Sequence, residues 1–422
     1  MTRPLPRAVR NGQHRGGVRI AIVAESFLPH MNGVTHSIVR VLEHLQRRGD
    51  EVLVIAPSTP DTDVPREVYG ARVHRVPAVA LAGYATVRVA WGGVYRVKRI
   101  LADYAPDVVH LASPFVLGWR AVQAAHQLGI PTVAIYQTEV PSYAARYGVP
   151  LLENWAWTRV EQIHLLASRT LAPSTFALNQ LRGRGIPRVQ MWRRGVDTER
   201  FNPARRDARW RAAVAPGGER IIGYVGRLAP EKQVEDLAAL AGLPGTRLVI
   251  VGDGPQRPEL ESALPDAVFT GFLAGDELPR AMASFDLFVH PGEFETFCQT
   301  IQEAMASGVP VVATGRGGPL DLVENSRTGW LYQPGDLTGL QDRVKDLIGD
   351  DAKRRAFATA ACASVQGRTW AALGDELLCH YASVAGDRMA GPAGPAGPAG
   401  PAVPAGPAGP ARLSGTGART AR

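Results

Sequence analysis

The sequence predicts an α/β protein of two domains. Short apolar runs typical of buried strands alternate along the chain with segments in which apolar residues recur at spacings of three and four, as in helices that cover a sheet. The alternation starts near Val18, pauses in an arginine-rich stretch, and restarts at Ile221. With 422 residues the chain has room for two domains with a core each. We therefore expect a first domain over residues 18–200 and a second over residues 201–370.

Composition and charge exclude several classes of protein. Apolar residues make up 45% of the chain and charged residues 20%, as in ordinary water-soluble proteins, and no apolar run approaches the ~20 residues of a membrane span. The net charge of +8 is compatible with nucleic acid, an anionic membrane surface or a phosphorylated substrate. Because the folded part shows no RNA-binding motif, zinc-finger spacing or separate basic arm, we expect no nucleic acid partner. The three scattered cysteines fit a reducing compartment.

The two ends of the chain differ from the rest. Residues 1–17 are basic but lack the apolar centre of a secretion signal, so we interpret them as a flexible leader on a cytoplasmic protein. Residues 387–422 contain repeated GPA triplets, broken once by Val403. A collagen helix needs glycine at every third position and three chains, so we expect a disordered tail instead.

The stretch from Asp286 to Thr314 predicts a strand, a loop, a helix and a second strand. An apolar run ends at His290, and the proline and glycine that follow turn the chain. Helical spacing then runs until Gly308, before a second apolar run over residues 309–313.

Two glutamates in this unit stand out, Glu295 in the loop and Glu303 in the helix. Eight residues of helix turn a side chain to within about 80° of its starting direction and raise it by about 12 Å. Both carboxylates can therefore face one elongated polar ligand at the carboxyl ends of the strands, where open α/β sheets have their crevices. The alternative is that Glu295 only favours the helix start and Glu303 is a solvated surface residue.

The sequence of this unit, HPGEFETFCQTIQEAMASGVPVVAT, closely resembles the donor-site signature of the retaining family 4 glycosyltransferases. The resemblance implies the GT-B fold, in which two Rossmann-like domains face each other across a deep cleft and a C-terminal helix, here residues 371–386, crosses back to the first domain. It also implies that Glu295 binds hydroxyls of the transferred sugar and Glu303 the ribose of the nucleotide, with Phe297 in the same donor-binding set. Carboxylates suit this work because each can accept two hydroxyl hydrogen bonds.

A second match lies in IIGYVGRLAPEKQVEDLAAL, where Arg227 ends a strand and Lys232 lies near a helix start. The alternative is that both cations are solvated, but in the resembling family the corresponding pair grips the donor diphosphate. Breaking the bond between sugar and phosphate puts charge on the leaving diphosphate. At ~4 Å and an effective dielectric constant of ~20, one cation is worth up to about 4 kcal/mol against a unit charge. Two cations can replace a metal ion, so we expect no metal and no cofactor.

The loop ESFLPHMNGVTHS near the N-terminus opens a helix at Gly33. Backbone amides at a helix start form an anion site, although a single glycine alone is more typical of a plain turn. The sequence of this loop resembles the N-terminal loop of the same glycosyltransferase family, which lies opposite the donor site. We therefore place Gly33 among the donor-binding residues.

The segment DVVHLASPFVLGWR places His110 at the end of a strand, where a lone histidine is usually a packing residue. In the resembling family a histidine near the reaction centre often belongs to an HxH pair, and Ala112 replaces the second histidine here. His110 is therefore a catalytic candidate with an uncertain role. Further on, YQTEVPSYAARYG resembles the actinobacterial mannosyltransferases that use GDP-mannose and act on glycolipids, and its polar strand exit puts Tyr136 and Thr138 on the acceptor side.

Three further features complete the interpretation. The resemblance places the chain near Phe272 and Leu273 against the nucleobase, mainly through backbone. The motif Asp61-Thr62-Asp63 resembles a metal-binding DxD, but it follows a strand in a proline-flanked loop and is better explained as a solvated turn. Residues 84–104 mix aromatic, apolar and basic side chains, which suits either an anionic lipid surface or a solvated helix face.

We therefore expect a retaining hexosyltransferase whose partners are a nucleotide sugar and a lipid-linked or small polar acceptor. GDP-mannose is the expected donor, and the enzyme is expected in the cytoplasm, with peripheral contact at the inner face of the plasma membrane as an option. The alternatives are a glucosyl or N-acetylglucosaminyl transferase that uses a UDP-sugar, a sugar-nucleotide epimerase of related GT-B shape, and a non-catalytic nucleotide-binding protein.

Overall fold

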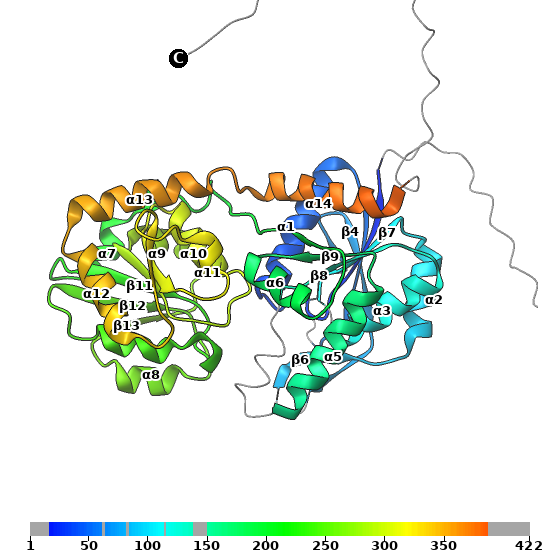
Figure 1. The fold of residues 1–422 in the computed structure, drawn as a ribbon, viewed down its shortest axis with the longest axis horizontal. Helices are drawn as coiled ribbons and strands as arrows, with labels where there is room; N and C mark the ends of the chain where they lie inside the picture. Colours follow the sequence, from blue (N-terminus) through cyan, green and yellow to red (C-terminus); the bar gives the residue numbers. More distant parts are fainter. Residues whose placement is uncertain (1–16, 61–63, 82–83, 114, 138–149, 387–422) are drawn as a thin grey trace, which may run out of the picture.

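Two parallel β-sheets, each covered by helices on both faces, divide the chain into two α/β domains (Figure 1). The structure is a computed structural model that describes residues 17–60, 64–81, 84–113, 115–137 and 150–386. The expected leader and tail, the Asp61-Thr62-Asp63 motif and Thr138 lie outside the described residues, except for Gly17.

The first sheet has eight strands in the order β10-β9-β8-β7-β1-β2-β4-β3, parallel throughout except for the β3–β4 pair. A separate antiparallel pair, β5–β6, lies between β4 and β7 in the chain. The strands are β1 (Arg19–Val23), β2 (Glu51–Pro57), β3 (Glu67–Val68), β4 (Ala71–Val76), β5 (Ala78–Leu81), β6 (Tyr84–Ala90), β7 (Val108–Leu111), β8 (Thr132–Ile135), β9 (Arg169–Ala172) and β10 (Val189–Met191). The helices of this domain are α1 (Gly33–Arg48), α2 (Val94–Tyr104), α3 (Val116–Gln127), α5 (Pro150–Leu166) and α6 (Thr175–Gly183).

Local sequence explains the first helix. The side chain of Asn32 accepts hydrogen bonds from the backbone N–H groups of Val34 and Thr35, which would otherwise lack partners at the helix start. Gly49 ends α1 at φ 77°, a conformation that glycine adopts without strain. Between these ends the apolar residues of α1 pack on one face of the sheet together with α14, while α2 and α3 cover the other face.

The second sheet has six parallel strands in the order β13-β12-β11-β14-β15-β16. They are β11 (Arg220–Val225), β12 (Thr246–Val251), β13 (Val268–Gly271), β14 (Leu287–His290), β15 (Val311–Thr314) and β16 (Gly329–Tyr332). The helices are α7 (Ala208–Val214), α8 (Arg257–Ala263), α9 (Glu277–Ser284), α10 (Gln299–Ala306), α11 (Pro319–Leu322), α12 (Leu337–Ile348) and α13 (Asp351–Val365), with 3-10 turns η1 (Pro203–Arg205), η2 (Pro230–Lys232) and η3 (Val234–Leu240). The predicted strand, loop, helix and strand are thus β14, the loop of residues 291–298, α10 and β15.

The chain crosses between the domains twice, and the two crossings lie side by side. Val196 on the way out forms a parallel bridge with Thr369 on the way back. The last helix, α14 (Trp370–Ala385), then lies across α1 of the first domain (Figure 1). Its side chains join the first core, and the indole N–H of Trp192 donates to the backbone oxygen of Leu373 at 2.9 Å. Across the described parts of the chain, none of the helices has the length and apolar character that crossing a bilayer requires.

Candidate active site

The loop of residues 291–298, between β14 and α10, carries the first predicted glutamate, and two residues of a neighbouring loop hold it in place. The side-chain amide of Gln233 donates to Glu293 Oε1 and the backbone N–H of Glu293 donates to Gln233 Oε1, both at 2.9 Å. Lys232 Nζ donates to Glu295 Oε1 at 2.5 Å. These contacts form because β11 and β14 are neighbouring parallel strands, so the loops after them meet at one edge of the sheet.

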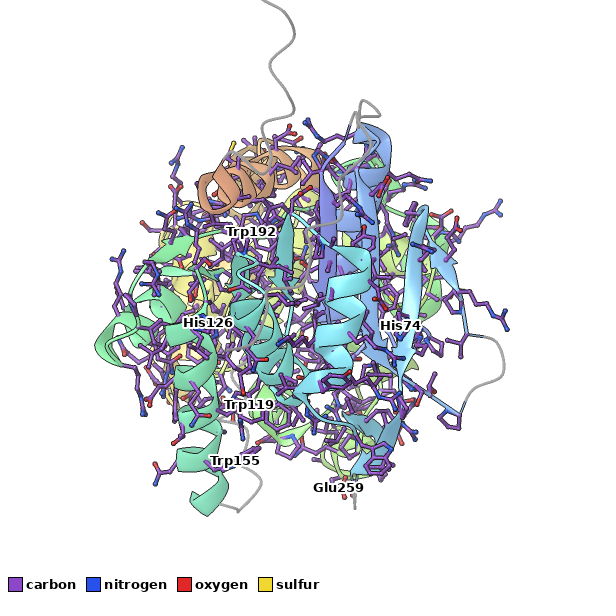
Figure 2. The ribbon with its side chains drawn as sticks, turned by 90° about the vertical axis from the view of Figure 1, so that its right-hand side faces the viewer. His74, Trp119, His126, Trp155, Trp192 and Glu259 are labelled. Carbon is purple, nitrogen blue, oxygen red and sulfur yellow. The ribbon has the colours of Figure 1, made fainter. Side chains whose placement is uncertain are left out.

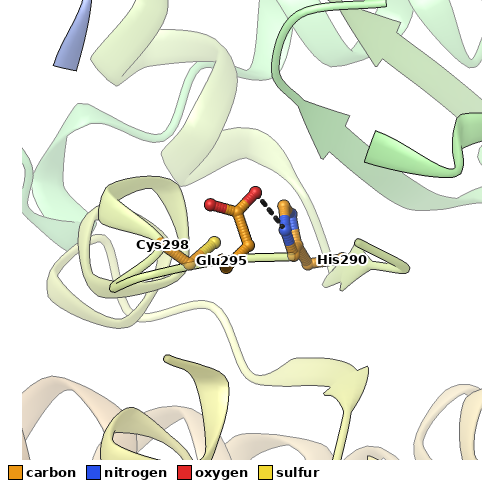
Figure 3. Close-up of side chains that lie close together, drawn as sticks. All are labelled: His290, Glu295 and Cys298. Carbon is orange, nitrogen blue, oxygen red and sulfur yellow. Dashed lines mark hydrogen bonds and ion pairs between the residues drawn. The ribbon is translucent and has the colours of Figure 1, made fainter. Parts of the chain in front are cut away.

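Glu295 lies between two cationic partners in a buried setting. Besides Lys232, His290 Nε2 lies 3.1 Å from Glu295 Oε1 (Figure 3). Burial alone would raise the pKa of Glu295, but Lys232 and His290 together hold it well below its ordinary value. For His290, burial acts to lower the pKa, while Cys298 and Glu295 outweigh it and raise the pKa above its ordinary range. Glu295 is therefore a stable carboxylate that can accept hydroxyl hydrogen bonds.

Cys298 stands beside this pair at the start of α10 (Figure 3). Its φ of 71° lies in the left-handed region, which costs a non-glycine residue free energy. Ligand atoms of His290, Glu295 and Cys298 all lie within 4.8 Å of one another, and among the described residues this is the one group with the composition of a metal site. Lys232 also donates to Glu295, so the carboxylate has a cationic partner within the protein.

Glu303, the second predicted glutamate, lies on α10 and faces the junction of the two domains. Burial raises its pKa to about 7, while the positive charges of Arg200 and of Arg40, from α1 of the first domain, act in the opposite direction. Arg40 is fixed by Asp197, whose Oδ2 lies 3.1 Å from Arg40 Nη2. Both domains thus contribute to the surroundings of this carboxylate.

α10 is fastened to the segment that joins the domains. The side-chain amide of Gln302 donates to the backbone oxygen of Arg194 at 3.1 Å, and that of Gln299 donates to Gly195 O at 3.0 Å. The guanidinium of Arg194 in turn lies over Gly33, where a Cβ would come within 3.1 Å of Nη1. Buried Arg194 therefore contacts both the start of α1 and helix α10, which carries Glu303.

The structure also brings in residues that sequence analysis missed. Arg194, Arg200 and Arg40 were not singled out, because an arginine-rich stretch such as that around residue 194 is usually a solvated rim. Gln233, which directly follows Lys232, was also passed over. Burial of Arg194, 7% exposed, is a tertiary property without a signal in the local sequence.

The predicted diphosphate residues lie in different settings. Lys232 is held against Glu295, whereas the side chain of Arg227 is 59% exposed and lies 3.8 Å from Glu231. Phe272, near the expected nucleobase position, is 75% exposed, and Leu273 packs partly against the core.

Three predicted site residues, Phe297, Tyr136 and His110, have buried side chains. Phe297 is 1% exposed and packs in the second core. Tyr136 is fully buried, stacks on Trp157 and donates its hydroxyl to Gln180 at 3.2 Å. In this structure both side chains pack in the cores, and the donor role of Phe297 and the acceptor role of Tyr136 stay predictions. Strands and helices buried on both faces give no sequence signal for which face a residue occupies.

His110 is the third buried residue of this set. It is 2% exposed on β7, and its Nδ1 forms a 2.5 Å hydrogen bond with the hydroxyl of Tyr381 on α14. Burial lowers the pKa of His110 to about 3, so the imidazole is neutral. These contacts are typical of a packing residue, and the catalytic role of His110 stays a prediction.

Comparison with known proteins decides which family this arrangement represents. Residues 31–200 match the family described as Glycosyltransferase Family 4, and residues 206–363 match Glycosyl transferases group 1. A GDP-mannose-dependent alpha-mannosyltransferase of Mycobacterium tuberculosis is 52% identical over 377 residues, which is 88% of this chain and 98% of that protein. The chain belongs to glycosyltransferase family 4. A protein of the same description from Mycolicibacterium smegmatis is 51% identical over 88% of this chain and 99% of that protein.

Solved structures agree on the fold of this family 4 glycosyltransferase. The sucrose-phosphate synthase of Thermosynechococcus elongatus superposes with a TM-score of 0.73 at 22% identity, covering 87% of this chain and 98% of that one. Anabaena HepE in complex with UDP and glucose gives a TM-score of 0.71 at 21% identity, covering 87% of this chain and all of that one. The GT-B fold predicted from the sequence is confirmed, and the protein is a transferase.

Proposed function

We propose that this enzyme transfers mannose, with retention of anomeric configuration, from GDP-mannose to a lipid-linked or small polar acceptor. The observation that carries the choice of donor is the match at 47–52% identity to three proteins described as GDP-mannose-dependent alpha-mannosyltransferases, over 87–88% of this chain. The position of Lys232 against Glu295 supports a donor site in the second domain.

Different site residues bind different parts of the sugar donor in this proposal. Glu303 accepts hydrogen bonds from the ribose hydroxyls, and Glu295 orients the sugar. Arg227 and Lys232 stabilise the negative charge that develops on the departing diphosphate, which is the position where preorganised cations contribute most to rate. The chain at Gly33 closes the site from the first domain, beside the N–H groups of Val34 and Thr35 that Asn32 already binds. This set of residues operates without a metal ion or cofactor.

Glu295 acts by positioning in this proposal and forms no covalent intermediate. Its low pKa, caused by Lys232 and His290 against the effect of burial, makes it a weak base and a weak nucleophile. When a sugar binds, its hydroxyl groups donate hydrogen bonds to Glu295. These bonds replace the contact with Lys232, which can then turn towards the diphosphate.

A lipid acceptor requires access to a membrane surface, and the first domain offers side chains suited to it. Trp91 and Tyr95, before and within the first turn of α2, are 66% and 77% exposed. Aromatic rings of this kind favour the interface between water and lipid. We propose peripheral contact of this segment with the cytoplasmic face of the membrane.

Transfer assays with purified enzyme test the function. Labelled GDP-mannose is supplied with and without a membrane lipid extract, and products are separated into free sugar, lipid and water-soluble fractions. Mannose recovered on an acceptor supports the proposal. Three results would overturn it. Transfer from UDP-glucose or UDP-N-acetylglucosamine alone would indicate a UDP-sugar transferase, and a free isomer without acceptor would indicate an epimerase. Binding without turnover would indicate a non-catalytic nucleotide-binding protein.

A further inference from the structure

A hollow of about 670 Å³ lies on the first domain between helix α2 and strands β2 and β4. Figure 2 shows His74, which lines the hollow, on the strand beside this helix. Its volume falls within the roughly 300–1,000 Å³ of pockets that bind small molecules. The hollow reaches Arg19 at the start of β1, whereas the donor site lies at the strand ends of the other domain.

The lining of this hollow is strongly basic. Five arginines contribute to it, together with His74, against a single carboxylate in the lining, that of Asp103. The arginines are Arg19, Arg66, Arg72, Arg96 and Arg99.

Among the five arginine side chains of the hollow, the structure shows an ion-pair partner for Arg19. Arg19 forms a 2.9 Å ion pair with Glu51, and its guanidinium lies 4.5 Å from the ring centre of Tyr104. Within the described chain, the side chains of the other four form neither a hydrogen bond nor an ion pair. They are all exposed and line the same space from both sides, Arg72 from β4 and Arg96 and Arg99 from α2.

This arrangement concentrates positive charge on one exposed surface. Like charges that face one another across a hollow repel, and nearby acidic side chains would normally relieve the repulsion. Burial and the charge of Arg96 lower the pKa of His74, so that its imidazole is neutral at pH 7 and offers an N–H without adding charge. Donors from several directions with an excess of positive charge match the oxygens of a phosphate group, which guanidinium groups bind through paired hydrogen bonds.

We propose that this hollow is a binding site for a phosphate-bearing anion, separate from the donor site. Arg72, Arg96 and Arg99 bind the phosphate oxygens in this assignment. The ligand is either a free polyphosphate or phosphorylated metabolite, or the phosphate headgroup of a lipid, since both present the same chemistry. The site does not depend on which sugar the enzyme transfers.

A pair of matched variants of the full chain tests the site. Arg72→Gln with Arg99→Gln removes two charges from the hollow. The control, Arg327→Gln with Arg343→Gln, removes two exposed charges from the second domain. Arg227→Gln alters the donor site only, which separates diphosphate binding there from binding in the hollow. Circular dichroism and unfolding midpoints establish that all three variants are folded.

Each protein is titrated with inorganic pyrophosphate by calorimetry, and is sedimented with phosphatidylcholine vesicles that contain phosphatidic acid or, at equal charge, a carboxylate lipid. Pyrophosphate binding supports a site for free phosphates if it is about tenfold or more weaker in the Arg72→Gln/Arg99→Gln protein (the hollow variant). The control and Arg227→Gln should then bind pyrophosphate as wild type does. Binding only to phosphatidic acid vesicles, lost in the hollow variant, supports a lipid headgroup as the source. Binding that the hollow variant retains, equal binding to carboxylate vesicles, or no binding of either probe would overturn the proposal.

Discussion

Lys232 Nζ lies 2.5 Å from Glu295 Oε1, although the two residues are 63 positions apart in the chain. The contact joins the loop after β11 to the loop after β14, at the edge where neighbouring parallel strands end. It places a cation that can meet a diphosphate directly beside a carboxylate that can meet a sugar. One local structure thus offers a group for each half of the activated sugar in the proposed reaction.

Replacing the lysine tests its part in the chemistry. We expect Lys232→Ala to lower kcat by roughly 10²–10³-fold, the effect of losing one preorganised group that stabilises charge in a transition state. Steady-state transfer kinetics measure this, with Lys345→Ala on exposed α12 as the control. Turnover within about threefold of wild type in a folded Lys232→Ala protein would show that the lysine does not act on the leaving group.

Glu303 predicts a pH dependence of donor binding. Burial raises its pKa to about 7, so the carboxylate is largely protonated at pH 6 and ionised at pH 8. Because the ionised form is the better acceptor for ribose hydroxyls, donor affinity should rise severalfold from pH 6 to pH 8. Calorimetric titration of wild type and Glu303→Gln at both pH values measures it, and an equal rise in the variant would assign the effect to another group.

The same carboxylate predicts the sign of a stability effect. Its pKa is higher in the folded protein than in the unfolded chain, so its contribution to stability is full at low pH and is lost as pH rises through about 7. Glu303→Gln should therefore raise the Tm relative to wild type more at pH 8 than at pH 5.

A glycine supports the loop that carries Glu295. The backbone N–H of Gly318 donates to Glu295 O at 2.7 Å, and a Cβ at this position would lie 2.4 Å from the backbone oxygen of Phe297. Gly318→Ala must displace the loop, and a shift of about 1 Å can cost on the order of 10²-fold in rate. Gly367→Ala, where the added Cβ meets no atom within 4 Å, is the matched control. Equal kcat in the two variants would contradict this role.

The packing contacts of His110 predict a change in stability without a change in chemistry. Tyr381→Phe removes the hydroxyl that pairs with His110 Nδ1 and leaves a buried polar atom without its partner. The free energy of unfolding should fall by about 1–3 kcal/mol, while kcat stays unchanged. Denaturant unfolding and transfer kinetics measure both quantities. A tenfold fall in kcat with unaltered stability would return His110 to the reaction centre.

Sequence analysis succeeded where local pattern determines structure. The helix that begins at Gly33 and the strand that ends at His290 follow from periodicity and from the glycine and proline residues that bound each run. The glutamates in their loop and helix were recognisable because a motif of fixed spacing carries them. The GT-B fold was predicted from the same motifs.

The remaining site residues depend on contacts between distant segments. His110 and Tyr136 come from the interior of a sheet covered on both faces, where alternation does not tell which side a residue faces. The environment of Arg194 is created by α10, more than a hundred residues later in the chain, whose Gln302 holds its backbone. Only the assembled domains turn this arginine from an apparent surface residue into a buried one.

The central claim is that Glu295 binds the sugar while other groups bind the nucleotide, and paired calorimetric titrations with GDP and GDP-mannose test it most directly. We expect Glu295→Gln to weaken GDP-mannose binding by roughly tenfold or more, as for the loss of a hydrogen bond to a charged group. GDP binding should remain as tight as in wild type or become tighter, because Lys232 is released from its ion pair. Equal weakening of both ligands, or of neither, would contradict the account.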